Sequence, residues 1–296
     1  APIPRLIVVY TTSSTFVAYW AARNVKERTM LDAKTLADYQ KDGAVPLRGV
    51  ISPEWIARLR EGVEENMRHP GPYVKQYTPE GNPGRFFGDY CNWQRIGPYR
   101  DFFFDSPTKQ LAAQLMGSAK VNLYHEHVLV KEPGTKERTP WHHDQPYYPI
   151  DGKDIISLWI PLDPVEKDTS IEFIAGSHAW GRWFTPARFV DQKTHANAQD
   201  SRFETPPDFE AERAQHHVLQ WALDVGDCVA FHGLTVHGSP ANASAHRRRA
   251  FSARFTGNDA RFVLRSGFMS PPPPESGGPA NGAAMDSESF PVLLAA

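Results

Sequence analysis

The chain has 296 residues, of which 41% are hydrophobic and 22% are charged. Such a chain is long enough to bury roughly three quarters of its extended surface in one large domain. Its 32 basic and 34 acidic residues give a formal net charge of −2, and without a basic surface nucleic acid is not an expected partner. Its two cysteines, Cys91 and Cys228, exclude a disulfide scaffold and favour a reducing, cytoplasmic location.

Residues 1–29 differ from the rest and are expected to form an N-terminal arm that packs on the domain. Residues 6–22 carry no charge, but the threonines and serines at 11–15 interrupt them. The apolar run is therefore shorter than the roughly 20 residues that a spanning helix needs. Membrane association is not expected, and the small-residue cleavage site of a signal peptide is missing.

Two amphipathic helices and a short strand are predicted next. The first helix starts at Met30 with Asp32 as a candidate N-cap and ends at Asp42-Gly43. Residues 45–50 are apolar and partly β-branched, which indicates a strand. Ser52 followed by proline and glutamate is typical of the start of a second helix.

The remainder up to residue 270 predicts a mainly β core with flanking helices. Short apolar or alternating runs, separated by glycine and proline turns, occur at 120–130, 155–162, 171–174, 228–232 and 247–256. Asn122, His125 and His127 do not fit an apolar strand face. One side of this sheet is therefore expected to line a polar cavity, as in the mouth of a β-barrel.

Two further segments lack a repeating pattern. Residues 182–220 are polar and long for a connection within a domain, which predicts a lid or capping insertion. Residues 271–296 begin with four prolines and continue with glycine, serine and alanine, which predicts an extended, Pro/Gly-rich C-terminal tail on the surface. The predicted domain therefore spans residues 30–270.

The strongest candidate site is a metal centre made by His142, Asp144 and His237. On a strand, positions i and i+2 face the same side, so His142 and Asp144 can bind one ion together. Two imidazoles and one carboxylate leave three octahedral positions open, an arrangement that suits non-haem Fe(II) with a bidentate co-substrate and O2. A His-x-Asp triplet also arises by chance in a histidine-rich chain.

Two further residues, Ser239 and Arg248, support this interpretation. Arg248 follows on the next predicted strand, and its guanidinium matches the carboxylate of a diacid co-substrate. Ser239 lies on the same face as His237 and can donate its hydroxyl to the same carboxylate. Although Arg247, Arg248 and Arg249 form a basic triplet, strand alternation turns the middle residue inward and its neighbours outward.

These motifs together resemble the phytanoyl-CoA dioxygenase family. The resemblance runs from about Met30 to Pro271 and rests on YQKDGAV at 39–45, PWHHDQPYYP at 140–149, SLWIPLD at 157–163, GSH at 176–178, and GDC at 226–228 with the following His237, Ser239, Asn242 and Arg248. It implies a double-stranded β-helix, a cupin-like jelly roll. Thr169-Ser170 and Ala175 depart from the family's Asn-Gly and Pro, which puts loop geometry in doubt rather than the metal site.

The resemblance also implies an activity and a set of contacts. It matches His142, Asp144 and His237 to iron ligands and Arg248 and Ser239 to the groups that hold 2-oxoglutarate, with Trp159 and His127 as further contacts. The expected reaction is hydroxylation of a small molecule with release of succinate and CO2, using Fe(II), 2-oxoglutarate and O2, and it is compatible with ascorbate as an accessory reductant. Desaturation, epoxidation or cyclisation is the alternative outcome. Related enzymes that halogenate have a small non-coordinating residue in place of Asp144.

Three residues are expected to face the substrate. Lys131 shares strand parity with His127, and Gln145 and Tyr147 follow the metal motif closely. The substrate's identity, including whether it is a CoA thioester, and the oligomeric state stay open.

Two readings of other classes compete with this one. His125, His127 and Glu132 resemble the first cupin motif and, with His237, would make a metalloenzyme that does not use 2-oxoglutarate. The second is a non-catalytic jelly-roll binding module. Such a module has no need of the three candidate ligands and Arg248, and their presence disfavours this hypothesis.

Overall fold

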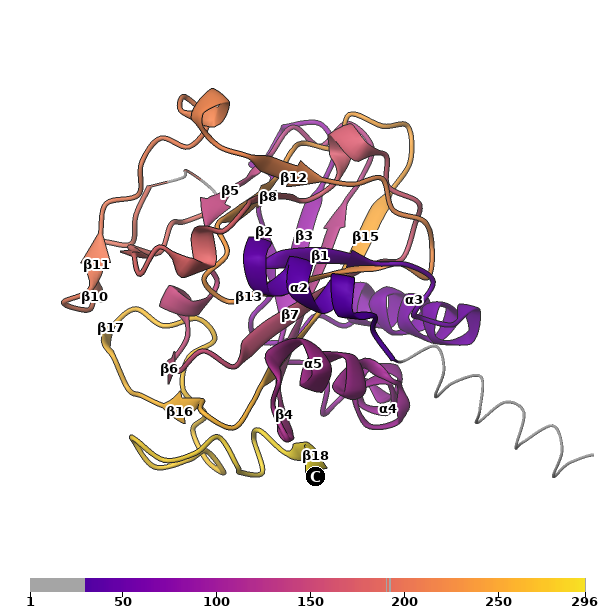
Figure 1. Cartoon of the computed structure of the whole chain (residues 1–296). Helices are drawn as coiled ribbons and strands as arrows, with labels where there is room; N and C mark the ends of the chain where they lie inside the picture. The colour runs from indigo at the N-terminus through magenta and orange to yellow at the C-terminus, as the bar shows by residue number, and fades with distance from the viewer. Residues whose placement is uncertain (1–29, 190, 192, 296) are drawn as a thin grey trace, which may run out of the picture.

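The computed structural model describes residues 30–189, 191 and 193–295, so the predicted arm at 1–29 lies outside the described residues. Its largest element is an antiparallel sheet in the order β1-β13-β7-β15-β4-β3-β2, with β18 pairing on β4 (Figure 1). The strands of this sheet are β1 (Ala44–Leu47), β2 (Lys75–Gln76), β3 (Phe86–Tyr90), β4 (Lys120–Lys131), β7 (Ile155–Pro161), β13 (Cys228–His232), β15 (Arg248–Thr256) and β18 (Val292–Ala295).

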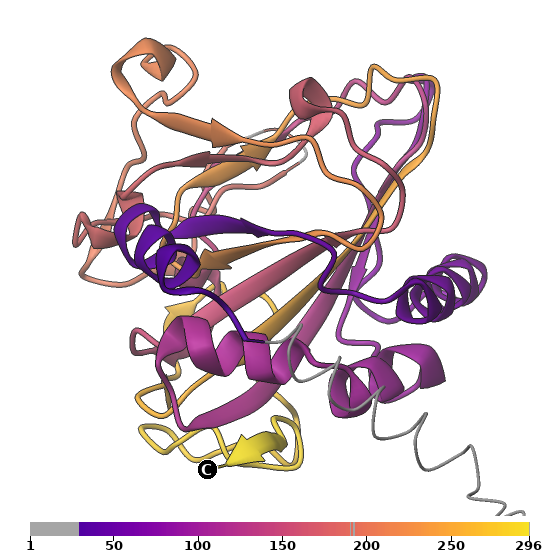
Figure 2. The same ribbon diagram turned by 45° about the vertical axis from the view of Figure 1, so that its right-hand side comes forward.

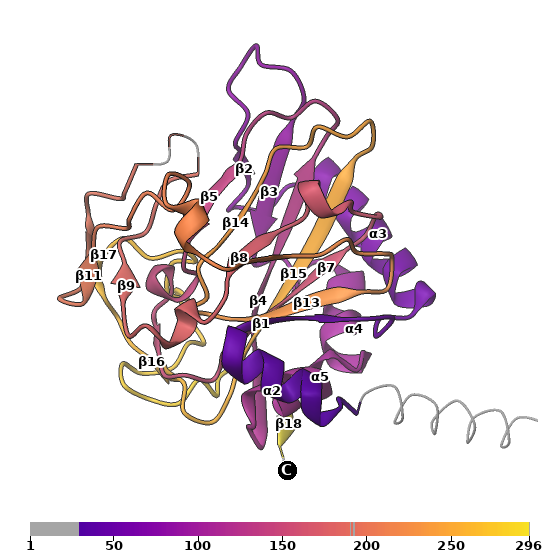
Figure 3. The ribbon, with the colours of Figure 1, turned by 45° about the horizontal axis from the view of Figure 1, so that its top comes forward.

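A smaller antiparallel sheet in the order β12-β8-β14-β5 faces it (Figure 3). Its strands are β5 (Thr139–His142), β8 (Glu172–Ile174), β12 (Val218–Gln220) and β14 (His237–Ser239). The chain crosses repeatedly between the two sheets, from β4 to β5, from β7 to β8 and from β12 through β13 and β14 to β15, which is the connectivity of a jelly roll. The fold is therefore the predicted double-stranded β-helix. Short two-stranded pairs lie outside it, formed by β6 (Ile150–Asp151) with β16 (Arg261–Phe262), β9 (Trp183–Phe184) with β11 (Phe203–Glu204), and β10 (Ala198–Gln199) with β17 (Ser266–Gly267).

Four helices flank the large sheet, and Figure 2 shows them beside its strands. They are α2 (Ala33–Asp42), α3 (Pro53–Arg68), α4 (Gly97–Asp105) and α5 (Thr108–Met116). The predicted caps are confirmed: Asp32 accepts from the backbone N–H of Thr35, and α2 ends at Gly43 in the left-handed conformation, with φ at 76°. A Cβ at Gly43 would also collide with His178 and Thr235, so the turn into β1 requires glycine.

The main hydrophobic core lies between these helices and the outer face of the large sheet. Phe251 on β15 is fully buried there, with its ring centroid 4.8 Å from that of Tyr99 and 5.5 Å from that of Phe102. Because side chains alternate along a strand, the opposite face of the same strands points between the two sheets. That inner face carries the polar residues.

The five strands predicted for the β core all form. In the predicted C-terminal tail most described side chains are exposed or half-buried, but three structural features also hold the segment to the domain. Within residues 271–295, Met285 and Phe290 are buried in an apolar cluster with Tyr124, and β18 extends the large sheet at β4. Composition favoured a solvated segment, but a few apolar side chains near the end of the chain suffice to anchor it. Among the described residues, no helix is long and apolar enough to cross a membrane.

Replacing Phe251 by alanine is expected to lower the free energy of unfolding by about 3–5 kcal/mol, because the ring leaves a cavity in the core. Denaturant unfolding followed by circular dichroism measures the change. Phe104→Ala is the matched control: its side chain is 37% exposed, so we expect a loss below about 1 kcal/mol. Equal losses in the two variants would contradict this placement of the core.

Candidate active site

Three side chains meet between the two sheets. His142 ends β5, Asp144 follows two residues later, and His237 begins β14 and pairs in register with His142. Their ligand atoms all lie within 4.8 Å of one another. The Oδ1 atom of Asp144 is 3.5 Å from Nε2 of His142 and 3.7 Å from Nε2 of His237. The three predicted metal ligands therefore converge on one point.

The strand alternation used to predict this pair holds only in part. β5 ends at His142, and Asp144 has the helical backbone angles φ −77° and ψ −47° at the start of a short 3-10 helix. A turn, rather than a continuing strand, therefore carries the carboxylate back to the same side.

Both imidazoles are held with Nε2 toward the common point. Nδ1 of His142 lies 2.8 Å from the carbonyl oxygen of Pro140, and Nδ1 of His237 lies 2.9 Å from that of Thr235. An Nδ1–H that donates to a carbonyl leaves Nε2 with its lone pair free. Burial, together with the neighbouring His142, lowers the pKa of His237 to about 3, which keeps this ring neutral.

The second oxygen of Asp144 is fixed by residues that were not predicted from the sequence. Oδ2 accepts from Ser157 Oγ at 3.2 Å and from Arg254 Nε at 3.3 Å, and Arg254 also donates to the hydroxyl of Tyr148. Burial opposes ionisation of Asp144, but the charge of Arg254 and the two imidazoles hold its pKa well below the usual range. The signal for Arg254 was available, because it lies six residues after Arg248 and so shares its strand face.

The inner face of the large sheet carries the remaining polar residues as cross-strand pairs. Along β4 and β15, Lys131 pairs with Arg248, His127 with Ser252, and His125 with Arg254. Trp159 on β7 pairs with Ser252 from the other side of β15, so it lies in line with Ser252 and His127. The register thus places Lys131 and Arg248 at one end of the face and His125 and Arg254 at the other.

A small cavity of about 50 Å³ lies at the Arg248 end. Arg248 Nη2 donates to Ser239 Oγ at 2.9 Å, and its Nη1 donates to the carbonyl of Thr169. Lys131 Nζ donates to the carbonyl of Pro240 at 2.9 Å and lies 4.4 Å from the ring centroid of Phe86. The predicted contacts Trp159 and His127 also line this cavity.

Two of the three cationic side chains that line the small cavity, Arg248 and Lys131, are buried without a counter-ion among the described residues. Arg248 is 6% exposed and Lys131 is 2% exposed, and neither forms an ion pair within the described part of the chain. Burial and the charge of Arg248 hold the pKa of Lys131 well below its usual range. By contrast, Arg247 and Arg249 turn outward and share Glu64, as alternation predicted. The small cavity therefore suits an anionic group.

A larger cavity of about 330 Å³ opens on the other side of the metal ligands. Tyr147 lines it, as predicted, and its hydroxyl donates to the carbonyl of Ala187 and accepts from the N–H of the same residue. Gln145, which was expected to face the substrate, is buried, donates to the carbonyl of Gly152 and lines neither of the two cavities. Lys131 lines the small cavity instead of the larger one.

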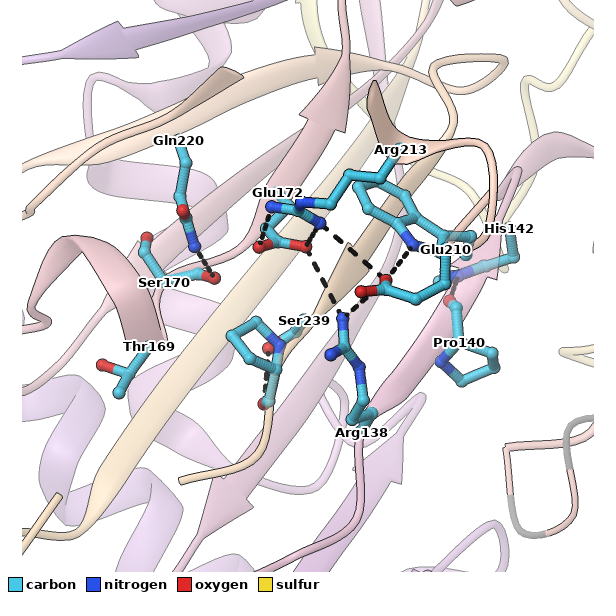
Figure 4. A network of polar contacts seen from close by, with 12 residues as sticks. Arg138, Pro140, His142, Thr169, Ser170, Glu172, Glu210, Arg213, Gln220 and Ser239 are labelled. Atoms are coloured by element: carbon cyan, nitrogen blue, oxygen red, sulfur yellow. Dashed lines mark hydrogen bonds and ion pairs between the residues drawn. The ribbon is translucent and has the colours of Figure 1, made fainter. Parts of the chain in front are cut away.

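The predicted lid divides into two parts. Ala187, Arg188, Phe189 and His195 line the larger cavity, whereas residues beyond 203 join an ion-pair network on the smaller sheet. In that network Arg213 binds Glu172 on β8 through two hydrogen bonds, of 2.8 and 3.0 Å (Figure 4). Glu210 accepts from Arg138 and from the indole of Trp141. Because Glu172 precedes Phe173, the partner of His237, this network supports the strand next to a metal ligand.

The alternative cupin ligand set does not assemble. Glu132 accepts from Arg247 on the outer side of β4, and in the described ranges the His142, Asp144 and His237 cluster is the one that could hold a metal. Because side chains alternate along the strand, Glu132 and His127 point to opposite faces.

Comparison with known proteins agrees with this geometry. The family model of phytanoyl-CoA dioxygenase (PhyH) matches residues 39–250. Peroxisomal phytanoyl-CoA dioxygenase of Bos taurus is 24% identical over 80% of this chain and 72% of its own length. The L-proline trans-4-hydroxylase of Streptomyces griseoviridis is 28% identical over 74% of this chain and 83% of its own.

A solved structure shows the same fold. The epimerase SnoN, in complex with Fe3+, alpha ketoglutarate and nogalamycin RO, has a TM-score of 0.67 at 19% identity, with 92% of this chain and 99% of that chain covered. The family model covers well over half of the chain, and the ligand triad lies within the matched residues. The chain therefore belongs to the phytanoyl-CoA dioxygenase family.

Proposed function

We propose that this protein is an Fe(II)- and 2-oxoglutarate-dependent dioxygenase that hydroxylates a small molecule and releases succinate and CO2. The observation that carries the proposal is the metal triad placed between a small cationic cavity and a larger aromatic one. Family membership and the relative named as a proline hydroxylase support it.

The residues present fit an iron ion. Two imidazole nitrogens and one carboxylate oxygen converge and both rings are held with Nε2 inward, which is a donor set that would suit non-haem iron. When bound with 2-oxoglutarate and O2, the iron supplies the oxidant for C–H hydroxylation. Ascorbate as an accessory reductant belongs to this proposal as well.

The small cavity is the proposed site of 2-oxoglutarate. Its distal carboxylate would lie against Arg248, Ser239 and Lys131. This carboxylate would give Arg248 and Lys131 the counter-ion that they lack. Trp159 and His127 form the walls between that carboxylate and the metal ligands. Lys131 was expected to bind substrate; we now assign it to the co-substrate.

The chain's own residues orient and shield the reacting groups. Arg254 and Ser157 hold Oδ2 of Asp144, so Oδ1 is the carboxylate oxygen that remains turned toward the two imidazoles and would bind the metal. The Tyr147 hydroxyl holds the backbone at Ala187 over the larger cavity, which limits the entry of water. Desaturation, epoxidation or cyclisation would use the same residues, and the choice depends on which substrate atom lies nearest the metal.

Asp144→Ala is expected to abolish stoichiometric Fe(II) binding, because one of three ligands is lost and Arg254 is left as an unpaired charge beside the site. Equilibrium dialysis under nitrogen, followed by metal analysis, measures the bound iron. His217→Ala, which changes an exposed histidine, should bind iron like the wild type. Iron retained at full stoichiometry in Asp144→Ala would contradict the assigned triad.

Arg248→Met is expected to weaken 2-oxoglutarate binding by roughly 30-fold or more, and Lys131→Met by at least about tenfold, since buried charge pairs contribute about 2–5 kcal/mol on truncation. Anaerobic calorimetric titration of the Fe(II)-loaded protein gives both affinities without turnover. Arg247→Met is the control, because this neighbour points outward to Glu64 and Glu132. No detectable 2-oxoglutarate binding by the wild type would refute the proposed function, and wild-type affinity in Lys131→Met would remove only that residue's role.

A further inference from the structure

Buried imidazoles without hydrogen bonds line the inner end of the larger cavity. Nδ1 of His125 and Nε2 of His127 are both buried, and neither has a hydrogen-bond partner among the residues that the structure describes. His125 is 3% exposed, and its ring centroid lies 4.4 Å from that of Tyr124 and 5.5 Å from that of Tyr148. An unpaired buried nitrogen is costly, so a bound molecule with a hydroxyl, amide or ring N–H is favoured at this end.

The mouth of the cavity carries an exposed lysine, Lys75, that forms no ion pair with the described residues. Lys75 on β2 pairs with Gly88 on β3, and Tyr77, two residues further on, lines the same cavity. Gly88 has no side chain, and the rings of Tyr77 and His127 lie against its Cα, below the exposed Lys75 at the mouth. Lys75 forms no ion pair within the described residues, whereas Arg188 at the same mouth is paired with Asp191.

The walls between these two ends are aromatic and carry no free acid. They are formed by Tyr77, Tyr90, Tyr147, Tyr148, Phe189 and Phe268. Asp144 is the one carboxylate among the described lining residues, and it is committed to the metal site and to Arg254. Aromatic rings favour flat or cyclic partners through stacking and edge contacts, and the lack of a free acid disfavours a cationic substrate.

From these three features we infer the substrate class: a free carboxylic acid that carries a ring and a polar group at the end opposite the acid. The inference rests on the proposed function and specifies what the oxygenase acts on. The acid would lie at Lys75 and the ring between the aromatic walls. The polar group would reach His125, which brings a nearby C–H bond toward the metal ligands.

The same features argue against an acyl-CoA thioester in this cavity. Its volume of about 330 Å³ is at the lower end of the ~300–1,000 Å³ of small-molecule sites. An aliphatic acyl chain in it would leave the His125 nitrogen unpaired, and esterification would remove the negative charge that Lys75 can bind. The relatives named for phytanoyl-CoA therefore differ from this chain in the substrate that we assign.

Calorimetric titration of the full chain, loaded with Mn(II) in place of iron and with 2-oxoglutarate, tests the assignment. The probes are 4-hydroxycinnamate, its methyl ester, cinnamate and palmitoyl-CoA. We expect 4-hydroxycinnamate to bind about tenfold more tightly than the ester and than cinnamate, because each comparison removes one hydrogen bond to a charged or buried group.

Two variants assign these preferences to residues. Lys75→Met should abolish the preference for acid over ester, and His125→Phe, which keeps a ring of similar size, should abolish the preference for the hydroxylated acid. Lys136→Met, an exposed lysine outside both cavities, is the matched control and should keep both preferences.

The outcomes separate this inference from the proposed function. A protein that fails to bind 2-oxoglutarate refutes the function itself. A protein that binds 2-oxoglutarate but prefers the ester, binds neither acid, or binds palmitoyl-CoA more tightly than 4-hydroxycinnamate overturns the substrate class alone.

Discussion

The buried contact between Arg254 and Asp144 is the interaction on which the site depends. Asp144 belongs to the connection after the smaller sheet and Arg254 to the centre of the large sheet, so their ion pair joins the two layers at the metal position. Two charged groups are expensive to bury and are stable only when each is fully paired. The hydrogen bonds from Ser157 to Asp144 and from Arg254 to Tyr148 complete that pairing. Ser157 and Arg254 thereby occupy Oδ2 of Asp144 and leave Oδ1 available to a metal ion.

The register of the large sheet determines where the polar side chains lie along its inner face. β15 pairs with β4 over nine positions, so the residues at 248, 252 and 254 are held at fixed spacing relative to their partners on β4. The cationic end, the middle and the imidazole end of the face are therefore set by backbone hydrogen bonds rather than by flexible loops. A rigid scaffold of this kind would keep the proposed co-substrate and substrate apart at defined positions around the metal ligands.

Much of this arrangement can be predicted from the sequence, for identifiable reasons. The triad, Arg248 and Ser239 follow from strand parity and motif spacing, and the caps at Asp32 and Gly43 follow from local chemistry. The helices over 97–116 were not predicted, because their packing against Phe251 depends on the sheet rather than on a regular apolar pattern. Likewise, Gln145 follows the metal motif in sequence, but the 3-10 turn directs it toward Gly152.

The segment after β15 forms part of the larger cavity and can therefore affect which substrates fit. Met269, Ser270 and Pro271 form part of the cavity wall, and Ser270 contacts the hydroxyl of Tyr90, while the strand that ends the segment is held by β4. The wall is thus part of a strap, residues 257–295, that is held by β15 and β18 at its ends and by pairing with β6 and β10 between them, and none of its residues belongs to the ligand triad. Exchange of this strap between related oxygenases offers a route to new substrate ranges with the iron chemistry left intact.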